Sequence, residues 1–390
     1  MAQYMVQEKF RRGLKRSNLV NADAADVIVV GGGTAGGATA ILCAQRGLKT
    51  LVLESRTDVA EIPGETLHPG IEPLFRALGV EREIKAAKFR RHCGYLINSN
   101  DTVSTNLYGS DARGVWYGYQ ADRGTLQTIL LDRAEACGAT MLRGTRALCP
   151  IFHEGRIAGI VSSAGVHRAQ FVVDASGHAH WLMRQLRLPV LEISPRLIAF
   201  FGWGVPDNRA NAPPQGLPEF VMREVGWAWR APIRDDRHAW VYVDLEPDLS
   251  RLRGNIRPRC PDGLLPLSKT GARDVSWRIA RPSAGPGYFL AGDAAWVLDP
   301  ACSHGVLFCF LSAMAAFDSI VKLLASDEEP ERIQARYSTW TERWFCRDAA
   351  ALISLYGRME KSPGWLSSAT AAVRYIAMSS SERALSSRRS

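Results

Sequence analysis

The chain has 390 residues, of which 46% are hydrophobic and 22% are charged, so it can bury large cores and is neither disordered nor of low complexity. Part of its formal net charge of +9 comes from residues 9–16 and 383–390, which we expect to be solvated arms. No nucleic-acid reading motif accompanies this charge, so nucleic acid is not an expected partner. The eight cysteines form no CxxC pair, which disfavours zinc and dithiol sites.

The sequence contains no obvious membrane span or export signal. Its longest apolar run, residues 305–317, is shorter than the ~20 residues that a span needs. The basic N-terminal region is not followed by an apolar signal core. We therefore expect a cytoplasmic protein without a membrane partner.

The strongest local pattern lies in residues 26–56, DVIVVGGGTAGGATAILCAQRGLKTLVLESR. A β-branched strand leads into Gly31, Gly33 and Gly36, which form a GxGxxG motif at the start of an Ala-rich helix. The first glycine makes a tight turn, the second lets the backbone approach a pyrophosphate, and the third lets helix and strand pack closely. Glu54 stands at the spacing of a carboxylate that binds ribose hydroxyls. A glycine-rich surface turn would not explain Glu54, so we predict a dinucleotide site.

A second motif lies far downstream, in residues 287–305, GYFLAGDAAWVLDPACSHG. An early GxGxxG followed by a distant Gly292-Asp293 pair resembles the FAD-binding flavoproteins of the glutathione-reductase type. This resemblance implies that Asp293 meets the ribityl chain of the flavin, a contact for which a simple NAD dehydrogenase has no use. Backbone N–H groups around residues 299–305 are expected to face the flavin, because a proline turn followed by a helix start aims several of them at one place.

Two further motifs resemble those of aromatic hydroxylases and halogenases in the same group. Residues 171–186, FVVDASGHAHWLMRQL, resemble the middle motif in which a strand ends beside the cofactor at an aspartate, here Asp174. Residues 122–144 resemble the arginine-led helix that precedes a strand, which implies that Arg123 lies near the FAD. The order of these motifs along the chain is more specific than any one of them.

The region expected to bind substrate has its own resemblances. Residues 63–79, PGETLHPGIEPLFRALG, resemble the strap that lies against the flavin in tryptophan halogenases and their non-halogenating relatives. Residues 226–233, GWAWRAPI, resemble the halogenase WxWxIP box. Trp227 and Trp229 alternate on one face of a strand, so they either contact substrate or fill the wall of a sheet.

One residue departs from the halogenase pattern. Halogenases of this group need a lysine shortly after the strap to handle the oxidised halogen. The matching position is Arg90, with Lys88 nearby but out of register. This departure favours oxygenation over halogenation.

The resemblance implies a set of site residues. The expected cofactor contacts are Gly31, Gly33, Gly36, Glu54, Arg56, Glu65, Thr66, Arg123, Asp174, Gly292, Asp293, Pro300 and Gly305. The expected catalytic residues are His68, His304, Trp227 and Trp229, although a histidine that merely fills a loop is the alternative for both histidines. Cys302 is expected to act as a small hydrophobe rather than as a reactive thiol.

The predicted fold is α/β, with a glutathione-reductase-type Rossmann FAD domain, an interleaved and mainly antiparallel substrate-domain sheet, and C-terminal helices. The expected divisions are a flexible basic arm (1–25), the FAD domain (26–90, 112–190 and 276–326), the substrate domain (91–111 and 191–275) and a C-terminal helical region (327–390).

The predicted activity is that of an FAD-dependent monooxygenase. NAD(P)H, binding transiently because only one GxGxxG is present, would reduce FAD, and O2 would add at flavin C4a to give a hydroperoxide that hydroxylates an aromatic ring. The combined motifs most resemble the halogenase-like flavoproteins that mature peptidyl tryptophan into tryptophylquinone, such as the monooxygenase serving quinohaemoprotein amine dehydrogenase. This implies a polypeptide substrate, the precursor subunit of a quinoprotein.

Three alternatives stay open at this point. A halogenase would act on free indoles or carrier-bound pyrroles. A geranylgeranyl-reductase-like enzyme shares the layout of motifs but would need a long apolar channel. A flavin-stabilised chaperone would bind an immature partner without turnover, and partner-stimulated consumption of NAD(P)H separates it from an enzyme.

Overall fold

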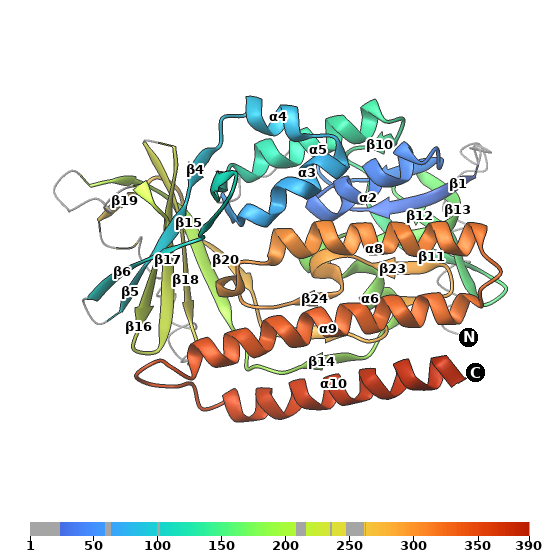
Figure 1. Ribbon diagram of the computed structural model, residues 1–390. Helices are drawn as coiled ribbons and strands as arrows, with labels where there is room; N and C mark the ends of the chain where they lie inside the picture. Colours follow the sequence, from blue (N-terminus) through green and yellow to red (C-terminus); the bar gives the residue numbers. More distant parts are fainter. Residues whose placement is uncertain are drawn as a thin grey trace.

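The computed structural model describes residues 24–58, 64–99, 102–207, 216–234, 236–246, 261 and 263–389, with side chains as far as residue 380. The basic arm expected over residues 1–25 lies outside the described residues, apart from its last two, and Ala25 already belongs to β1 (Ala25–Val30). Figure 1 shows a helix-covered sheet next to a second sheet, which stands at one end of the molecule.

The first sheet is built on a core of parallel strands. Its order is β10-β2-β1-β13-β12-β11, with β23 and β22 continuing beside β13. β1 pairs in parallel with β2 and β13, and β13 in parallel with β23, whereas β11, β12 and β13 pair antiparallel. The strands besides β1 are β2 (Thr50–Leu53), β10 (Thr140–Leu142), β11 (Ala147–His153), β12 (Arg156–Ser162), β13 (Gly165–Asp174), β22 (Ala284–Gly285) and β23 (Tyr288–Leu290).

Both faces of this sheet are covered, as the unbroken apolar run of β1 requires. Val27 and Val29 belong to one buried cluster, with side chains of α2 (Thr34–Gln45), α5 (Arg123–Ala136) and α8 (Gly305–Ala325). Ile28 and Val30 point the opposite way, because side chains alternate along a strand, and belong to a second cluster. That second cluster also contains Trp227 and Trp277, so one continuous core joins the first sheet to the second.

The second sheet is mostly antiparallel, and the exception is the parallel pairing of β16 with β5. Its order is β19-β15-β18-β17-β16-β5-β6, and β20 pairs with β15. Figure 1 shows these strands standing at one end of the molecule. They are β5 (Gly94–Ser99), β6 (Thr102–Leu107), β15 (Ile198–Pro206), β16 (Glu219–Arg223), β17 (Gly226–Arg234), β18 (Arg237–Asp244), β19 (Leu264–Pro266) and β20 (Gly271–Asp274).

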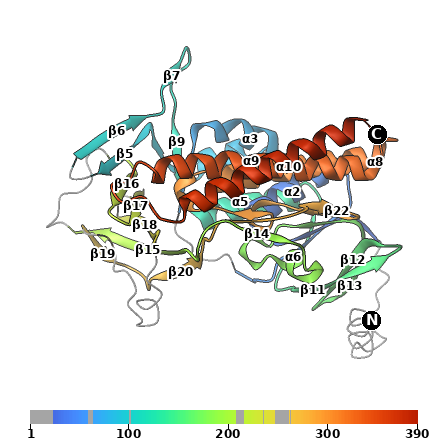
Figure 2. The same cartoon turned by 90° about the horizontal axis from the view of Figure 1, so that it is seen from below.

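Short sheets connect the two units. β3 (Glu65–Leu67), which carries the strap motif, pairs with β9 (Gly118–Ala121), and β9 leads directly into α5. Figure 2 shows β7 projecting away from the body. The remaining strands are β4 (Arg90–His92), β7 (Ser110–Asp111), β8 (Gly114–Val115), β14 (Val190–Glu192), β21 (Arg278–Ala280) and β24 (Trp296–Val297).

The C-terminal part is helical, as expected. Figure 1 shows α8, α9 (Pro330–Tyr356) and α10 (Leu366–Arg389) stacked in succession. α10 continues to Arg389, so the arm expected over residues 383–390 has a helical backbone up to that residue, and its solvation stays a prediction. The other helices are α3 (Glu72–Leu78), α4 (Glu81–Ala86) and α6 (Trp181–Leu186), with short 3-10 turns at Pro69–Ile71, Gly177–Ala179, Gly292–Ala294 and Pro300–Cys302.

Within the described ranges, α8 is the one helix long and apolar enough to cross a membrane, with 44% of its apolar window buried inside the protein. The apolar run at 305–317 is thus part of a longer helix than the sequence suggested. A single helix of this kind is a weak indication, because core helices pass the same test. Phe310, Ala313 and Ile320 of α8 are fully buried in the cluster shared with α2.

The predicted α/β architecture is therefore confirmed. The division into FAD and substrate domains remains a proposal, and the two large sheets are consistent with it.

Candidate functional site

Three motifs that are far apart in sequence meet at one edge of the first sheet. The strand register pairs Val30 with Asp174, and Asp174 with Leu290, at the carboxyl ends of β1, β13 and β23. The GxGxxG turn, the DASG turn and the Gly-Asp turn follow these strands directly, so the fold brings them together. This edge is where open parallel α/β sheets bind ligands.

The three glycines differ in the way a dinucleotide turn requires. Gly31 has a φ of +101°, and a Cβ placed on it would lie 2.5 Å from the carbonyl oxygen of Ala175. A Cβ on Gly36 would lie 1.8 Å from the carbonyl oxygen of Gly31, so neither position accepts a side chain. A Cβ on Gly33 would meet nothing within 4 Å, so this position faces open space. The turn therefore fits a pyrophosphate at Gly33.

The start of α2 offers the donors that such a phosphate needs. Gly33 is the N-cap, and no side chain caps this helix. Its first N–H groups, which have no partner within a helix, point to the same open side, where the helix dipole favours an anion. The residues present thus fit the diphosphate of FAD.

Glu54 already has two backbone partners. Its Oε2 accepts a hydrogen bond from the N–H of Gly32 at 2.7 Å, and its Oε1 accepts one from the N–H of Arg56 at 2.8 Å. The carboxylate therefore holds the glycine turn in place, and its binding of ribose hydroxyls stays a prediction. Arg56 itself is exposed.

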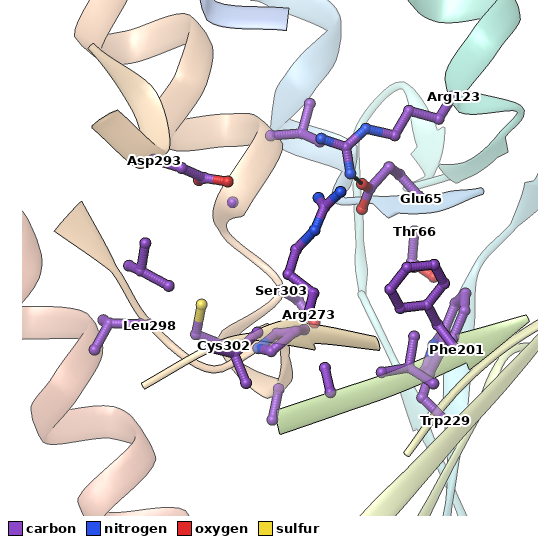
Figure 3. A pocket seen from close by; sticks show the side chains of 18 of the residues that line it. Glu65, Thr66, Arg123, Phe201, Trp229, Arg273, Asp293, Leu298, Cys302 and Ser303 are labelled. Atoms are coloured by element: carbon purple, nitrogen blue, oxygen red, sulfur yellow. Dashed lines mark hydrogen bonds and ion pairs between the residues drawn. The ribbon is translucent and has the colours of Figure 1, made fainter. Parts of the chain in front are cut away.

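A pocket of about 210 Å³ opens between this edge and the second sheet. Figure 3 shows the charged side chains on one side of it and aromatic side chains on the other. The predicted cofactor contacts that line the pocket are Glu65, Thr66, Arg123, Asp293, Pro300 and Gly305. The lining residues from the second sheet are Ala199, Phe201, Phe220, Trp227, Trp229, Val241 and Arg273.

Glu65 and Arg123 form an ion pair on the cofactor side of the pocket. Arg123 Nη1 lies 2.8 Å from Glu65 Oε1, and both side chains are partly buried. Burial raises the pKa of Glu65 from its usual value, and the charge of Arg123 opposes this rise. The resemblance placed both residues near FAD, and the structure brings them together from β3 and from the start of α5.

Asp293 is paired with a residue that sequence reasoning missed. Its Oδ2 lies 3.1 Å from Nδ1 of His178, which follows the DASG motif and also lines the pocket. Burial alone would raise the pKa of Asp293, but the hydrogen bond and charge of His178, with Arg123 and Arg273, lower it to about 2. Asp293 is therefore an anion at neutral pH. His178 Nε2 is buried and has no partner among the described residues.

Arg273 is the second residue that sequence reasoning missed. It lies on β20 and reaches into the pocket from the second sheet (Figure 3). Its guanidinium lies 5.9 Å from the centre of the Phe201 ring. Burial lowers the pKa of Arg273, and the neighbouring charge of Arg123 lowers it further. No motif in the sequence marked this position.

The aromatic wall is built as the tryptophan box predicted. Trp227 is buried at 2% exposure and stacks on Phe220 at 5.3 Å between ring centres, and Trp229 is partly buried on the same strand. Both tryptophans line the pocket and also pack in the core, so the packing role is present and contact with a substrate stays a prediction.

Trp227 is held by a buried carboxylate. Its Nε1 donates a hydrogen bond to Oδ2 of Asp299 at 3.3 Å, and the N–H of Ala301 donates one to Oδ1 at 2.8 Å. Asp299 is fully buried, and burial raises its pKa to about 6, although these hydrogen bonds oppose the rise. Cys302, which lines the pocket nearby, has its pKa raised by burial to about 12, so its thiol stays protonated.

The two predicted catalytic histidines do not line the pocket. His304 stands between two lining residues, but its Nδ1 lies 3.1 Å from Oδ1 of the buried Asp348. His68 caps a 3-10 turn by accepting a hydrogen bond from the N–H of Gly70, and its ring lies 5.4 Å from that of Tyr108. The geometry supports structural roles for both, and it does not bring them to the aromatic wall.

Asp174 and Gly292 shape turns rather than face the pocket. Asp174 is fully buried, and its carboxylate accepts hydrogen bonds from the N–H groups of Ser176 at 2.9 Å and Leu182 at 2.7 Å. This carboxylate does not line the pocket, so its direct contact with the cofactor stays a prediction that the pocket lining does not support. Gly292 is buried with a φ of +60°, which orients the neighbouring Asp293.

The segment in which halogenases carry their lysine does not contribute to the pocket lining. Lys88 is exposed, Arg90 lies on β4, and neither lines the pocket. The internal segments outside the described ranges contain no lysine in the sequence. In the part of the chain that the structure describes, no lysine lines the pocket.

Comparisons with known proteins agree with this site. Residues 96–373 match the tryptophan halogenase family, and residues 26–60 match an FAD-binding domain. The tryptophan 2-halogenase of Chondromyces crocatus is 25% identical over 355 residues, covering 85% of this chain and 67% of the relative. A 1H-pyrrole-2-carbonyl-[peptidyl-carrier protein] brominase of Pseudoalteromonas luteoviolacea is 26% identical, covering 81% of this chain and 82% of the relative.

Solved structures share the fold. The myxobacterial chondrochloren halogenase CndH aligns with a TM-score of 0.77 and 23% identity, covering 89% of this chain and 86% of that one. P. aeruginosa PqsL in complex with 2-aminobenzoylacetate aligns with a TM-score of 0.71 and 20% identity, covering 89% of this chain and 99% of that one. Because the family match extends over most of the sequence and the glycine turn fits its cofactor, the chain belongs to the tryptophan halogenase family of FAD-dependent flavoproteins.

Proposed function

We propose that this chain oxidises an electron-rich aromatic ring that packs on the wall formed by Trp227 and Trp229. When bound and reduced, FAD reacts with O2 and so supplies an electrophilic oxidant. A reduced nicotinamide or a separate reductase provides the electrons, since only one GxGxxG motif is present. We further propose that the protein works in the cytoplasm.

The proposed placement of FAD rests on the positions of the residues that fit its diphosphate and its ring system. Glu54 and the open Gly33 lie toward one end of the site, and Asp293 leads into the pocket. A dinucleotide whose diphosphate lies at Gly33 therefore extends its ring system toward Glu65, Thr66 and Pro300. The pocket lining supports this placement.

The protein itself contributes orientation and exclusion of water. Trp227, Trp229 and Phe220 offer flat apolar surface against which an indole or pyrrole can stack. The Glu65–Arg123 ion pair fixes the strap on the opposite side. Holding two reactants in one geometry in a dry site lowers the activation barrier, by about 7–11 kcal/mol in well-oriented systems.

Two reactions of the aromatic ring, halogenation and hydroxylation, are supported by different observations. The curated relatives are named as halogenases, and two of them are named for a pyrrole group on a peptidyl carrier protein. By name, these relatives support halogenation better than hydroxylation. They also support a substrate carried on a protein.

The pocket supports hydroxylation. The lysine that the halogenase resemblance requires is absent from the pocket lining in the described ranges. Arginine does not replace it, because a guanidinium stays protonated and cannot form the same halogen adduct as an amine. We therefore propose hydroxylation of a polypeptide-borne tryptophan, as in tryptophylquinone maturation, with halogenation of an indole or pyrrole as the second candidate.

One experiment separates the two. The holoenzyme is incubated with reductant, labelled O2, bromide and tryptophan-containing polypeptide or indole substrates, and the products are analysed by intact mass. Hydroxylation predicts one labelled oxygen and no bromine isotope pattern. A brominated product would establish the second candidate instead, and a parallel reaction without bromide controls for halide inhibition.

A further inference from the structure

The guanidinium of Arg273 lines the pocket, and the proposed function leaves it without a role. Arg273 reaches the pocket from β20, whereas the other charged lining residues come from the cofactor side. Among the described residues its guanidinium has no hydrogen bond and no ion pair, and it lies 5.9 Å from the centre of the Phe201 ring. Its five N–H donors are therefore available to a ligand.

The nearby carboxylates are already engaged. Glu65 is bonded to Arg123 at 2.8 Å, and Asp293 to His178 at 3.1 Å. Burial and the charge of Arg123 both lower the pKa of Arg273, and the charges of Asp293 and Glu65 offset this lowering only in part. An anion that enters the pocket would relieve both effects.

Arg273 lies where the ring end of the cofactor is expected. The pocket begins at Thr34 and Asp293, next to the diphosphate turn, and extends past Glu65 to the tryptophan wall. Figure 3 shows Arg273 pointing toward the Glu65–Arg123 pair from the side of the aromatic wall. A ring system held between these groups would be next to the guanidinium, which lines the same pocket.

We propose that Arg273 binds the negative charge that the FAD ring system carries after reduction, and so raises the potential of the bound cofactor. This inference rests on the proposed placement of FAD in the pocket. A hydride donor such as a reduced nicotinamide transfers two electrons and one proton to the oxidised ring. The nicotinamide becomes oxidised, and the ring gains one negative charge. Arg273 stays protonated throughout and donates hydrogen bonds to the charged edge.

The test measures the midpoint potential of bound FAD in the wild-type holoenzyme and three variants, without oxygen, halide or aromatic substrate. Arg273→Gln removes the charge, and Arg273→Lys keeps the charge but loses the planar fork. Arg237→Gln is the matched control, because Arg237 lies on β18 of the same sheet, 5.2 Å from the Trp203 ring, and does not line the pocket.

Arg273→Gln is expected to weaken binding of reduced FAD at least tenfold relative to oxidised FAD, which lowers the two-electron potential by about 30 mV. Arg273→Lys should lower the potential by a smaller amount. If Arg273→Gln does not retain FAD, the comparison of Arg273→Lys with the wild type provides the test. Arg237→Gln should match the wild type.

Equal potentials in the wild type and both Arg273 variants would overturn the inference. Because no aromatic substrate is present, these outcomes are independent of whether the enzyme hydroxylates or halogenates.

Discussion

The indole N–H of Trp227 donates a hydrogen bond to the carboxylate of Asp299 at 3.3 Å, so the aromatic wall of the pocket is fixed to the loop that borders the cofactor side. Asp299 precedes Pro300, Ala301 and Cys302, which all line the pocket. A change in the charge of this carboxylate therefore acts on both sides of the site at once.

The first prediction concerns the pH dependence of stability that Asp299 causes. Burial raises its pKa from 3.8 to about 6, so between these values the native state binds more protons than the unfolded state. The contribution of protonated Asp299 to stability is fully present below the pKa that this group has in the unfolded state, and it is lost as the pH rises through about 6. The loss amounts to ~3 kcal/mol.

Asp299→Asn should lack this component. Urea unfolding of the wild type and the variant at a series of pH values gives the difference in unfolding free energy, in which the other titrating groups cancel. This difference should move in favour of the variant as the pH rises from 4 to 7. A difference that does not change with pH would contradict the assignment.

The second prediction uses the contrast between two glycines. Gly33→Ala should leave the fold of the cofactor-free protein intact, because its Cβ meets nothing within 4 Å, but the methyl group enters the space expected for the diphosphate. Gly36→Ala should destabilise the protein itself, because its Cβ would lie 1.8 Å from a backbone oxygen. Thermal unfolding of the FAD-free proteins and titration with FAD distinguish the two effects. If both variants still bound FAD like the wild type, the cofactor would have to bind elsewhere.

Sequence patterns predicted the parts of the site that depend on local backbone. The GxGxxG turn needs only a strand, three glycines and a helix, and Gly31, Gly33 and Gly36 take the expected roles. Motif resemblance also brought Glu65 and Arg123 to the same pocket. These residues could be predicted because their neighbours in sequence fix their conformation.

The residues that were missed depend on contacts between distant segments. Arg273 reaches the pocket only because β20 pairs with β15 in the second sheet, and no local pattern records that pairing. His304 was expected in the site from its motif, but its ring is held by Asp348 of α9. A motif fixes where a backbone runs, whereas the direction of a side chain is decided by its tertiary partners.

The third prediction tests Asp293 as a cofactor ligand. Asp293→Ala should weaken FAD binding about 10- to 100-fold, because hydrogen bonds to charged groups contribute ~1.5–3 kcal/mol. Asp318→Ala is the control, since Asp318 lies exposed on α8 and pairs only with Lys322 one turn away. Quenching of FAD fluorescence on binding provides the measurement. Purified wild-type protein should be yellow, and equal affinities in the wild type and Asp293→Ala would remove this carboxylate from the cofactor site.

The last prediction is that the enzyme acts on a tryptophan within a polypeptide and not on the free amino acid. A pocket for free tryptophan pairs the substrate's ammonium and carboxylate with charged groups, because unpaired buried charges are costly. Arg230 of the tryptophan box is not available for this, since it is paired with the buried Glu219. Glu65 and Asp293 are likewise paired, with Arg123 and His178. Arg273 also lines the pocket, and we have proposed that it binds the reduced cofactor.

A polypeptide substrate needs no such charges in the pocket, because contacts outside it position the indole. Binding energy far from the reacting carbon is then used for orientation, so its loss lowers turnover as well as affinity. The net charge of +9 favours an acidic polypeptide. The measurement is incorporation of labelled oxygen into free tryptophan, a neutral tryptophan peptide and an acidic tryptophan peptide of equal length. The acidic peptide should react fastest, and its advantage should fall as salt is added. Oxygenation of free tryptophan at an equal or higher rate would contradict the polypeptide hypothesis and leave the flavin chemistry of the pocket untouched.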